Sequence, residues 1–266
     1  MSVTDTLIVI VAAAVKNHGI AIGKQNPWRL AKDLAYFHRV TTTVTGEGKP
    51  SSQQAAAAVG NNNSGGGERG SPDEKLGEPS SLDGVPVMNA CILGRKTWEA
   101  LPKRFRPLKG RYNIVVTSDA QLFGKHDETP EYTVTQPSMK AALEFIEQMN
   151  TAVSSADTAP IVIGQRAYID RVFITGGGGI YDEALKMNDR HLQVLITYVQ
   201  LHDEEKCNAC DAFFPQMDNN RFRLQPHSRL EEVVSFEVPS GPQIEGGIEY
   251  EFLLYEKKEA DAGESE

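Results

Sequence analysis

A buried β-strand that runs directly into four consecutive glycines constrains the fold of this chain more than any other feature. The apolar run at residues 171–175 predicts the strand, and residues 180–187 predict a helix behind the turn. Glycine lets a backbone approach a ligand closely, and the free N–H groups at a helix N-terminus attract anions. The segment therefore predicts an α/β fold whose glycine turn binds phosphate.

The four glycines alone do not identify a dinucleotide-binding fold. The fingerprint GxGxxG is matched only trivially within them. No acidic residue on a following strand fits the ribose partner of a Rossmann unit. Both observations count against a Rossmann dehydrogenase.

Strand and helix patterns alternate through most of the chain. Further buried strands are expected at residues 6–15, 86–93, 111–117 and 192–200, and helices at residues 30–40 and after Ser138. Two segments that read as strands, residues 230–238 and 248–256, close the chain. We therefore expect a single α/β domain with a central, mainly parallel sheet of about eight strands, flanked by helices, and a C-terminal antiparallel hairpin.

Residues 44–85 differ abruptly in composition from the rest of the chain. They are rich in Ser, Gln, Ala, Asn and Gly and show no hydrophobic period, which predicts a low-complexity insertion. A polar connection is expected at residues 151–159, and residues 258–266 form an acidic tail. The expected organisation is one domain at residues 1–257, interrupted by the insertion.

The balance of charge limits what the chain can bind. Lys and Arg total 27 against 36 Asp and Glu, which gives a formal net charge of −9. This excess argues against binding of nucleic acid and of anionic membranes. The apolar run at residues 7–15 is too short to span a bilayer and has no basic residue ahead of it, so we interpret it as a strand.

Three cysteines, Cys91, Cys207 and Cys210, cannot all pair, which together with the missing signal favours a cytoplasmic localisation. Cys207 and Cys210 have the CxxC spacing of many zinc sites. Zinc would need two more ligands, and only His202 is close in sequence. We therefore predict no metal site.

The helix at residues 30–40 carries an acid on its apolar face. Leu30, Asp33, Leu34 and Phe37 follow the i, i+3, i+4, i+7 spacing, which predicts that all four face the core. A buried carboxylate is costly unless hydrogen-bond donors or a ligand compensate it, so Asp33 is a candidate site residue. The alternative is an Asp at the edge of the face that caps the helix or pairs with Lys32 or Arg29.

Gly94-Arg95-Lys96-Thr97 joins a predicted strand to a short helix that Pro102 ends. A glycine turn, two cations and a hydroxyl at a helix N-terminus suit an anion, because the free N–H groups and the helix dipole act together. The alternative is a basic, well-capped surface turn.

Five blocks in chain order together resemble the dihydrofolate reductase family, and its fungal members in particular. They are PWRL at 27–30 with Asp33 and Phe37, GRKTW at 94–98, RPLKGR at 106–111, ITGG at 174–177 and DAFFP at 211–215. The resemblance covers nearly all of the chain outside residues 44–85, part of 151–169 and the tail. It implies a monomeric, NADPH-dependent enzyme that reduces 7,8-dihydrofolate to 5,6,7,8-tetrahydrofolate and binds antifolate inhibitors.

The resemblance also implies roles for residues around the substrate. Asp33 would accept hydrogen bonds from the pterin 2-amino group and N3–H, and would favour protonation of N5 by water. Thr197 would hydrogen-bond Asp33, and Arg111 would hold the glutamate α-carboxylate. The other implied residues are Trp28 at the catalytic centre and Val11, Phe37, Leu108 and Thr175 around the pterin and benzoyl groups. Core packing is the alternative role for the apolar ones.

The implied NADPH site lies on the glycine turns. Its residues are Ala13 and Ile20 beside the nicotinamide, Gly94, Arg95, Lys96, Thr97, Gly176, Gly177, Gly178, Gly179, Ile180 and Tyr181 at the phosphates, and Thr117 and Ser118 at the 2′-phosphate. The Gly176–Gly177 peptide is expected to be cis, as in the family. Vertebrate members commonly have a cation where this chain has Ser118, so Arg95 would contribute more to the choice of NADPH over NADH.

The loop beside the nicotinamide departs from the family pattern. Asn26 stands where the family usually has Leu or Met before the Pro-Trp pair, and Ala21-Ile22-Gly23 is also unusual. A polar residue there would affect loop closure and water access.

Three other functions compete with this interpretation. A riboflavin-pathway reductase of the same fold would share the glycine turn but not the block at residues 27–33 or Arg111. A pterin- or nucleotide-binding protein without turnover would not need both Asp33 and Thr197. An interaction protein that acts through residues 44–85 would need aromatic anchors, which the insertion lacks.

Overall fold

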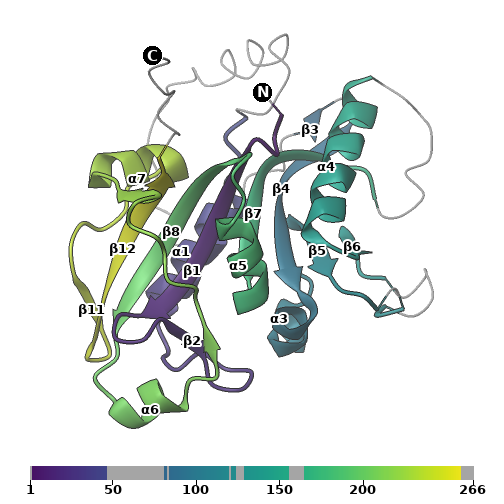
Figure 1. Cartoon of the computed structure of the whole chain (residues 1–266). Coiled ribbons are helices and arrows are strands. Elements are labelled where there is room, and N and C mark those ends of the chain that lie inside the picture. The colour runs from purple at the N-terminus through teal and green to yellow at the C-terminus, as the bar shows by residue number, and fades with distance from the viewer. Residues whose placement is uncertain are drawn as a thin grey trace, which may run out of the picture.

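The computed structural model describes residues 2–46, 81–82, 84–119, 121–123, 129–155 and 165–258. Strands and helices alternate along most of this length (Figure 1). The strands are β1 (Thr6–Ala14), β2 (Gly19–Ala21), β3 (Ser81–Leu82), β4 (Val85–Gly94), β5 (Arg111–Val116), β6 (Thr133–Gln136), β7 (Tyr168–Gly176), β8 (His191–Gln200), β9 (Ala212–Phe213), β10 (Phe222–Leu224), β11 (Gln243–Glu245) and β12 (Ile248–Lys257). The helices are α1 (Ala31–Thr42), α3 (Arg95–Ala100), η1 (Lys103–Phe105), α4 (Met139–Ser154), α5 (Gly178–Leu185), α6 (Glu204–Ala209) and α7 (His227–Val234).

The main sheet has the strand order β10-β12-β8-β1-β7-β4-β5-β6, with β3 and β11 paired at its sides. The six strands from β8 to β6 are parallel to one another. β12 runs antiparallel to its neighbour β8, and β10 runs antiparallel to its neighbour β12. A short hairpin of β11 and β12 lies near the C-terminus. These findings confirm the predicted α/β class, the mainly parallel sheet and the C-terminal antiparallel hairpin.

The central strand β1 is buried on both faces because apolar residues occupy every position after Thr6. Its odd-numbered residues from Leu7 to Ala13 pack into one core cluster, and Ile8, Ile10 and Ala14 pack into a second. Helices α4 and α5 cover the first cluster and α1 and α7 contribute to the second (Figure 1). The layers therefore follow helix, sheet, helix, as expected for parallel strands.

Helix α4 begins where the sequence predicts, because Ser138 caps it. The Ser138 side chain accepts a hydrogen bond from the Ala141 N–H at 3.1 Å. The helix then continues to Ser154, so the polar connection expected from residue 151 was wrong at its start. Val153 is buried and packs with Leu82 and Tyr168, which explains why the last turn stays helical.

The strand predicted at residues 230–238 was wrong. Residues His227–Val234 form helix α7, and Leu230 and Val234, four positions apart, are its buried residues. Pro226 precedes the helix, where its missing N–H costs nothing. The i, i+4 spacing of these apolar residues fits a helix, whereas strand alternation would have placed both on one face with Glu232 between them.

Helix α1 confirms that Asp33 is buried, at 8% exposure, but Leu34 is 56% exposed. The buried face is centred on Asp33, Tyr36 and Val40. Leu34 lies about 100° around the helix from Asp33, at the edge of that face. The prediction of a buried Leu34 was therefore wrong.

The predicted insertion at residues 44–85 lies mostly outside the described residues. Its described C-terminal end is ordered, because Leu82 pairs with Val85 in the hairpin of β3 and β4. The acidic tail beyond residue 258 is not described either. The domain boundaries therefore stay predictions.

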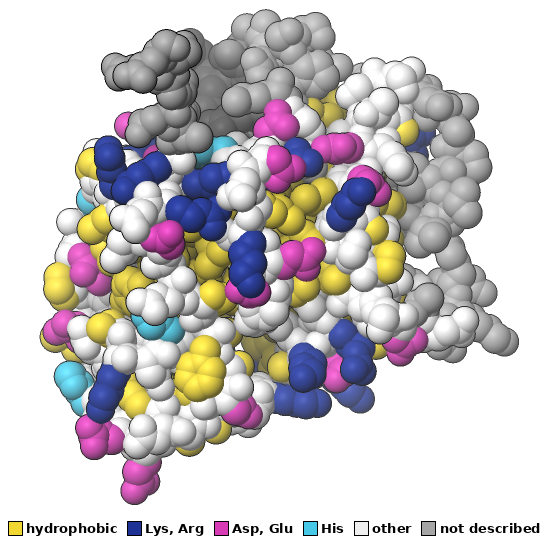
Figure 2. All heavy atoms as spheres, in the orientation of Figure 1, with side chains coloured by type: hydrophobic (Ala, Val, Ile, Leu, Met, Phe, Trp, Pro, Cys, Tyr) yellow, Lys and Arg dark blue, Asp and Glu magenta, His cyan; other side chains and the backbone are white. Residues whose placement is uncertain are grey.

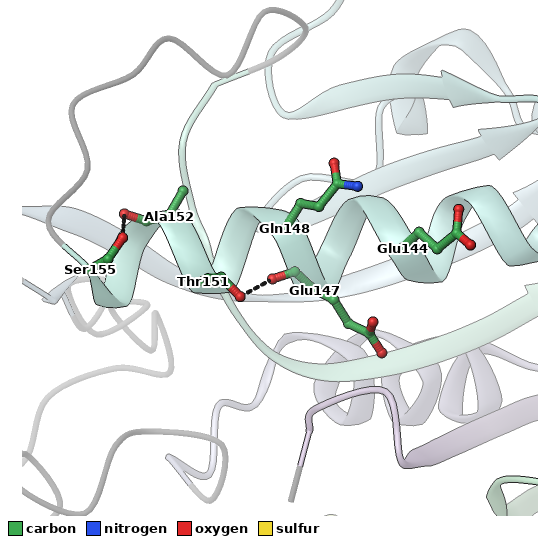
Figure 3. A pocket seen from close by; sticks show the side chains of 6 residues that line it. All are labelled: Glu144, Glu147, Gln148, Thr151, Ala152 and Ser155. Atoms are coloured by element: carbon green, nitrogen blue, oxygen red, sulfur yellow. Dashed lines mark hydrogen bonds between the residues drawn. The ribbon is translucent and has the colours of Figure 1, made fainter.

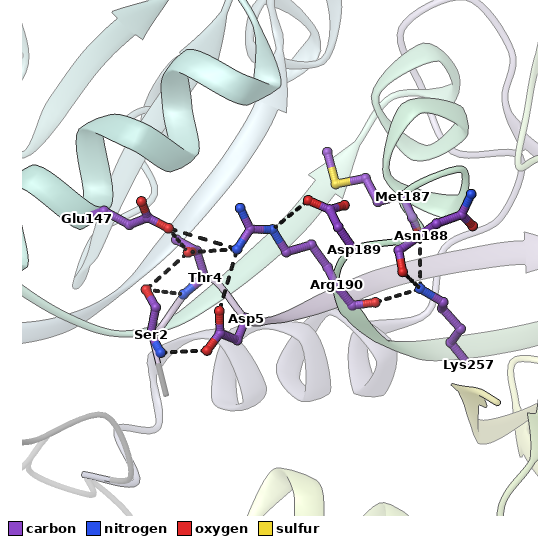
Figure 4. Close-up of polar contacts among 9 residues, drawn as sticks. All are labelled: Ser2, Thr4, Asp5, Glu147, Met187, Asn188, Asp189, Arg190 and Lys257. Carbon is purple, nitrogen blue, oxygen red and sulfur yellow. Dashed lines mark hydrogen bonds and ion pairs between the residues drawn. The ribbon is translucent and has the colours of Figure 1, made fainter. Parts of the chain in front are cut away.

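Polar contacts join four segments at the amino-terminal edge of the parallel strands (Figure 4). The Arg190 guanidinium lies 3.5 Å from the Asp5 carboxylate and 3.9 Å from that of Glu147. The Lys257 ammonium donates to the carbonyls of Met187, Asn188 and Arg190 at 2.7–3.1 Å. This cluster ties the start of β1, the segment after α5 and the end of β12 to the middle of α4. It lies away from the opposite edge, where the predicted site residues lie. Among the described helices, none combines the length and apolar character needed to cross a membrane.

Candidate active site

The carboxyl ends of the parallel strands bring most of the predicted site residues to one edge of the sheet. Ala13 is the last but one residue of β1, Gly94 ends β4, Gly176 ends β7 and Thr197 lies near the end of β8. Because neighbouring parallel strands end at the same edge, segments far apart in the sequence meet there. This edge is the candidate active site.

Asp33 lies in the first turn of α1 and faces β8. Thr197, on β8, is 2% exposed and its side chain is hydrogen-bonded to the Asp33 carboxylate. Burial raises the pKa of Asp33 to about 6, the hydrogen bond from Thr197 opposes that rise, and the charge of Glu245 adds to it. A carboxyl group with this pKa exchanges protons near neutral pH.

Two unpaired polar atoms lie in the same core cluster as the α1 helix. Trp28 is 8% exposed, and its Nε1–H has no hydrogen-bond partner among the described residues. The hydroxyl of Tyr36 is likewise buried and unpaired within the described part of the chain. Buried donors normally have partners. The unpaired Trp28 donor fits a site that holds water or a polar ligand.

Arg111 opens β5 and is 5% exposed. Its Nη1 donates to the Thr41 hydroxyl at 2.8 Å, and its Nε donates to the Lys109 carbonyl at 3.0 Å. The guanidinium carbon lies 5.9 Å from the centre of the Phe37 ring. Burial lowers the pKa of Arg111, which still leaves it charged at neutral pH. α1 and β5 thus bring Phe37 and Arg111, two of the predicted substrate residues, close to each other.

Thr41 was missed by the sequence analysis. Its hydroxyl accepts the hydrogen bond from Arg111 and donates one to the Phe37 carbonyl at 2.7 Å. It therefore orients the guanidinium from the C-terminal end of α1. The available signal was its position four residues after Phe37, which places both on the same side of the helix.

The remaining predicted substrate residues are distributed over three elements. Val11, on β1, is 8% exposed and pairs with Ile196 on β8. Thr175, on β7, donates a long hydrogen bond to the Ile92 carbonyl at 3.3 Å. Leu108 is 7% exposed, and its N–H and C=O are both bound by the Asn113 side chain. Burial of Val11 and Leu108 is also compatible with a role in the core.

The two glycine turns lie against each other. A Cβ added at Gly94 would lie 3.2 Å from Ile180 Cγ1, and one at Gly177 would lie 2.9 Å from Thr97 Oγ1. One at Gly178 would lie 2.8 Å from the Phe213 carbonyl. The structure thus joins the starts of α3 and α5 into one surface that has no room for side chains at these glycines.

The peptide bond between Gly176, at the end of β7, and Gly177 is cis, as expected. Gly177 precedes the first turn of α5, and its carbonyl accepts the Tyr181 N–H at 2.9 Å. The N–H groups of the first three helical residues have no partner within the helix itself. They give the start of α5 the character of an anion site.

Basic side chains gather near α3. Arg95 and Lys96 at its start are exposed, as are Lys103 and Arg104 of η1. Figure 2 shows Lys and Arg side chains at the lower right of the displayed face, in the region where Figure 1 places α3. Arg95 pairs with Glu99 at 3.0 Å, an exposed contact that a phosphate can displace.

The other predicted cofactor residues lie outside the two glycine turns or point away from them. Thr117 follows β5 and its hydroxyl accepts the Asp119 N–H at 3.0 Å, whereas Ser118 is exposed. The side chain of Tyr181 points into the core, where its hydroxyl donates to the Ile10 carbonyl at 2.9 Å. Ala13 is buried, and Ile20 packs against the same cluster.

The loop that contains Asn26 is tied to the segment after α6. Both Asp211 carboxylate oxygens accept the Gly23 N–H at 3.0 Å, and the Asp211 N–H donates to the Ala21 carbonyl at 3.0 Å. β2 also pairs with β9. Asn26 itself is exposed. The position of this loop therefore depends on residues near 211.

Two other features lie apart from this edge. A hollow along α4 is lined by Glu144, Glu147, Gln148, Thr151, Ala152 and Ser155 (Figure 3), none of which belongs to the predicted site. Cys207 and Cys210 are free thiols on or next to α6. Among the described residues, no three His, Cys, Asp or Glu side chains are grouped so that they could hold a metal ion.

Comparison with known proteins decides the family. The model of the family described as "Dihydrofolate reductase" matches residues 85–237, more than half of the chain. The chain belongs to the dihydrofolate reductase family. It is 28% identical to the dihydrofolate reductases of Heliothis virescens and Pneumocystis carinii, over 93% of this chain and 96% and 95% of theirs.

The fold comparison agrees with the family. The solved structure of Schistosoma mansoni dihydrofolate reductase covers 94% of this chain and 97% of its own, with a TM-score of 0.58 and 24% identity. The family model confirms the family predicted from the five sequence blocks, and the solved structure agrees with its fold. The insect and the Pneumocystis relatives are equally similar in identity.

Proposed function

We propose that this protein reduces 7,8-dihydrofolate to 5,6,7,8-tetrahydrofolate with NADPH. The observation that carries the proposal is the buried pair of Asp33 and Thr197 at the carboxyl edge of the sheet. Burying a carboxylate costs free energy, so a pocket that keeps one is expected to use it for a ligand.

Asp33 binds and orients the pterin in this proposal. Its two oxygens accept hydrogen bonds from the 2-amino group and N3–H, as a carboxylate does with two parallel donors. The hydrogen bond from Thr197 keeps the carboxylate in position. With a pKa of about 6, Asp33 also favours protonation of N5 by a water molecule near neutral pH.

Arg111 binds the other end of the substrate. Its guanidinium is oriented by Thr41 and Lys109 and remains charged in its buried position. A planar, oriented guanidinium suits the α-carboxylate of the glutamate tail. Phe37 lies beside it and contacts the benzoyl group between the two ends.

NADPH is supported by the character of the glycine turns. A side chain at Gly177 or Gly178 would collide with neighbouring atoms, and the start of α5 offers free N–H groups next to the basic residues of α3. These residues would hold the phosphates, with Thr117 and Ser118 near the 2′-phosphate and Ala13 and Ile20 near the nicotinamide. When bound, NADPH supplies the hydride that adds to C6, while the proton adds to N5 and the double bond between these atoms becomes single.

We infer a cytoplasmic monomer that binds dihydrofolate and antifolate inhibitors. Thiols at all three cysteines fit a reducing compartment.

The test is the loss of NADPH absorbance with dihydrofolate, for the wild type, Asp33→Ala and Asp33→Asn. We expect turnover by the wild type and a loss of at least about 100-fold in kcat/KM for both variants. A folded wild type without turnover would contradict the proposal. The pyrimidine substrate of riboflavin-pathway reductases serves as the comparison, and turnover of that substrate alone would support the related reductase instead.

A further inference from the structure

Glu245 caps the helix that carries Asp33, although it lies far away in the sequence. Helix α1 begins after Leu30, whose extended backbone is typical of an N-cap but whose side chain cannot accept a hydrogen bond. The Ala31 N–H donates to Glu245 Oε1 at 2.7 Å, and the Lys32 N–H donates to Oε2 at 3.0 Å. One carboxylate thus satisfies two of the free N–H groups of α1.

The hairpin of β11 and β12 places Glu245 on the face that meets α1. Glu245 pairs with Ile248, and Ile248 packs against the same core cluster as Leu30 and Tyr36. Glu249, one position along, pairs with Ile244 and lies on the other face of the hairpin. Glu245 and Glu249 therefore differ in orientation although both are acids of the same hairpin.

The charge of Glu245 acts on Asp33. An anion in the first turn of a helix is stabilised by the helix dipole, and Asp33 occupies that turn. Glu245 places a second negative charge at the same helix end, and the two carboxylates repel each other. This makes Asp33 easier to protonate.

Among the described residues, the groups that face Asp33 from the elements packed against it carry no charge besides that of Glu245. They are the hydroxyls of Thr197 from β8, Tyr36 from α1 and Tyr250 from β12, and the carboxylate of Glu245 from β11. The nearest cations in sequence, Arg29 and Lys32, are exposed. Burial is the main cause of the raised pKa of Asp33, and Glu245 supplies the charge that adds to it.

We propose that Glu245 is a positioning residue for Asp33: it fixes the first turn of α1 and supplies the negative charge that favours protonation of the catalytic carboxylate. This inference rests on the dihydrofolate reductase function proposed above. Glu245 acts through Asp33 and moves the pH range in which the enzyme works to higher pH.

The test compares Glu245→Gln and Glu245→Ala with Glu249→Gln as the matched control. Glu245→Gln removes the charge and keeps one acceptor oxygen, whereas Glu245→Ala removes both. The titration of the Asp33 carboxyl carbon is followed by NMR in the free protein, and the pH dependence of kcat/KM is followed with dihydrofolate. Hydrogen exchange of the Ala31 and Lys32 amides reports on the cap.

We expect Asp33 to titrate at lower pH in Glu245→Gln than in the wild type. The pH profile of kcat/KM should also move to lower pH in this variant. The Glu249→Gln control should match the wild type in both. Amide exchange at Ala31 and Lys32 should be fastest in Glu245→Ala.

An Asp33 titration that is the same in Glu245→Gln and the wild type would overturn the inference. Because the titration needs no substrate, it decides the inference even if the wild type shows no turnover. Absence of turnover would overturn the proposed function instead. If Glu245→Ala does not fold, Glu245→Gln still gives the decisive titration.

Discussion

The Thr197 side chain, on β8, is hydrogen-bonded to the carboxylate of Asp33, on α1, and both side chains are buried. The contact joins the central sheet to the helix that covers it. It stabilises the charged form of an acid that burial alone would drive toward the neutral form. Burial, this hydrogen bond and the charge of Glu245 together leave Asp33 with a pKa of about 6.

Replacement of Thr197 by Val should raise the pKa of Asp33 above about 6. The variant removes the hydrogen bond that stabilises the carboxylate, while the burial of Asp33 stays the same. NMR titration of the Asp33 carboxyl carbon measures the change, and the pH profile of kcat/KM should move to higher pH with it. Thr197→Ser keeps the hydroxyl and should stay close to the wild type. An unchanged titration in Thr197→Val would show that the hydrogen bond does not control Asp33.

Asp33→Asn should stabilise the folded protein at pH 7.5. The pKa of Asp33 rises from 3.8 in the unfolded chain to about 6 in the fold, so the folded state binds the proton more tightly. Its contribution to the free energy of unfolding is therefore fully favourable below pH 3.8 and is lost as pH rises through about 6. At about 1.4 kcal/mol per pKa unit, the ionised carboxylate costs on the order of 3 kcal/mol.

Denaturant unfolding of the wild type and Asp33→Asn, at pH 4 and at pH 7.5, measures this cost. The gain from Asn should be present at pH 7.5 and should shrink toward zero at pH 4. A variant that is less stable than the wild type at pH 7.5 would mean that the carboxylate is better compensated than its burial indicates.

Arg111→Lys should weaken binding of dihydrofolate through the glutamate tail. Lysine keeps a positive charge but cannot form two parallel hydrogen bonds with a carboxylate while also donating to Thr41. Loss of a charge-assisted pair is worth about 1.5–3 kcal/mol, so KM should rise by about 10- to 100-fold. The matched substrate is 7,8-dihydropteroate, which lacks the glutamate. An equal loss with both substrates would place the role of Arg111 elsewhere.

Gly178→Ala should destabilise the protein, and Gly179→Ala should not. A Cβ at Gly178 would lie 2.8 Å from the Phe213 carbonyl, a backbone atom that cannot move freely, whereas a Cβ at Gly179 would meet nothing within 4 Å. Both positions are in α5, where alanine is otherwise favoured over glycine. We expect Gly178→Ala to lose about 1–3 kcal/mol. Thermal unfolding measures both variants, and equal melting temperatures would contradict the close approach.

The sequence was most informative where a segment is apolar throughout. The strands at residues 6–15, 86–93 and 192–200 could be predicted from their mostly apolar sequences. Parallel strands are buried on both faces and therefore consist of nearly continuous apolar residues. Helix α7 was misjudged because eight residues containing Leu230, Val233 and Val234 support a strand as well as a helix. Only the packing of Leu230 and Val234 against the sheet decides between them.

The candidate site was predictable in part. Asp33 breaks an apolar pattern, and the family resemblance supplied its partner Thr197. Glu245 could not be found in the same way, because it acts through a contact with a distant segment that leaves no local pattern. The position of Thr41 four residues after Phe37 places it on the same side of α1, but its contact with the distant Arg111 leaves no pattern in the sequence. The exposure of Leu34 depends on how α1 is rotated on the sheet, which spacing alone fixes only approximately.

The most direct measurement of the central claim uses NADPH that carries deuterium at both C4 positions of the nicotinamide. The enzyme is incubated with this cofactor and 7,8-dihydrofolate, and the product is analysed by mass spectrometry and NMR. The account predicts tetrahydrofolate with a single deuterium, located at C6, from the wild type, and at least about 100-fold slower formation by Asp33→Asn. Tetrahydrofolate without deuterium at C6, or equal rates for the wild type and the variant, would contradict it.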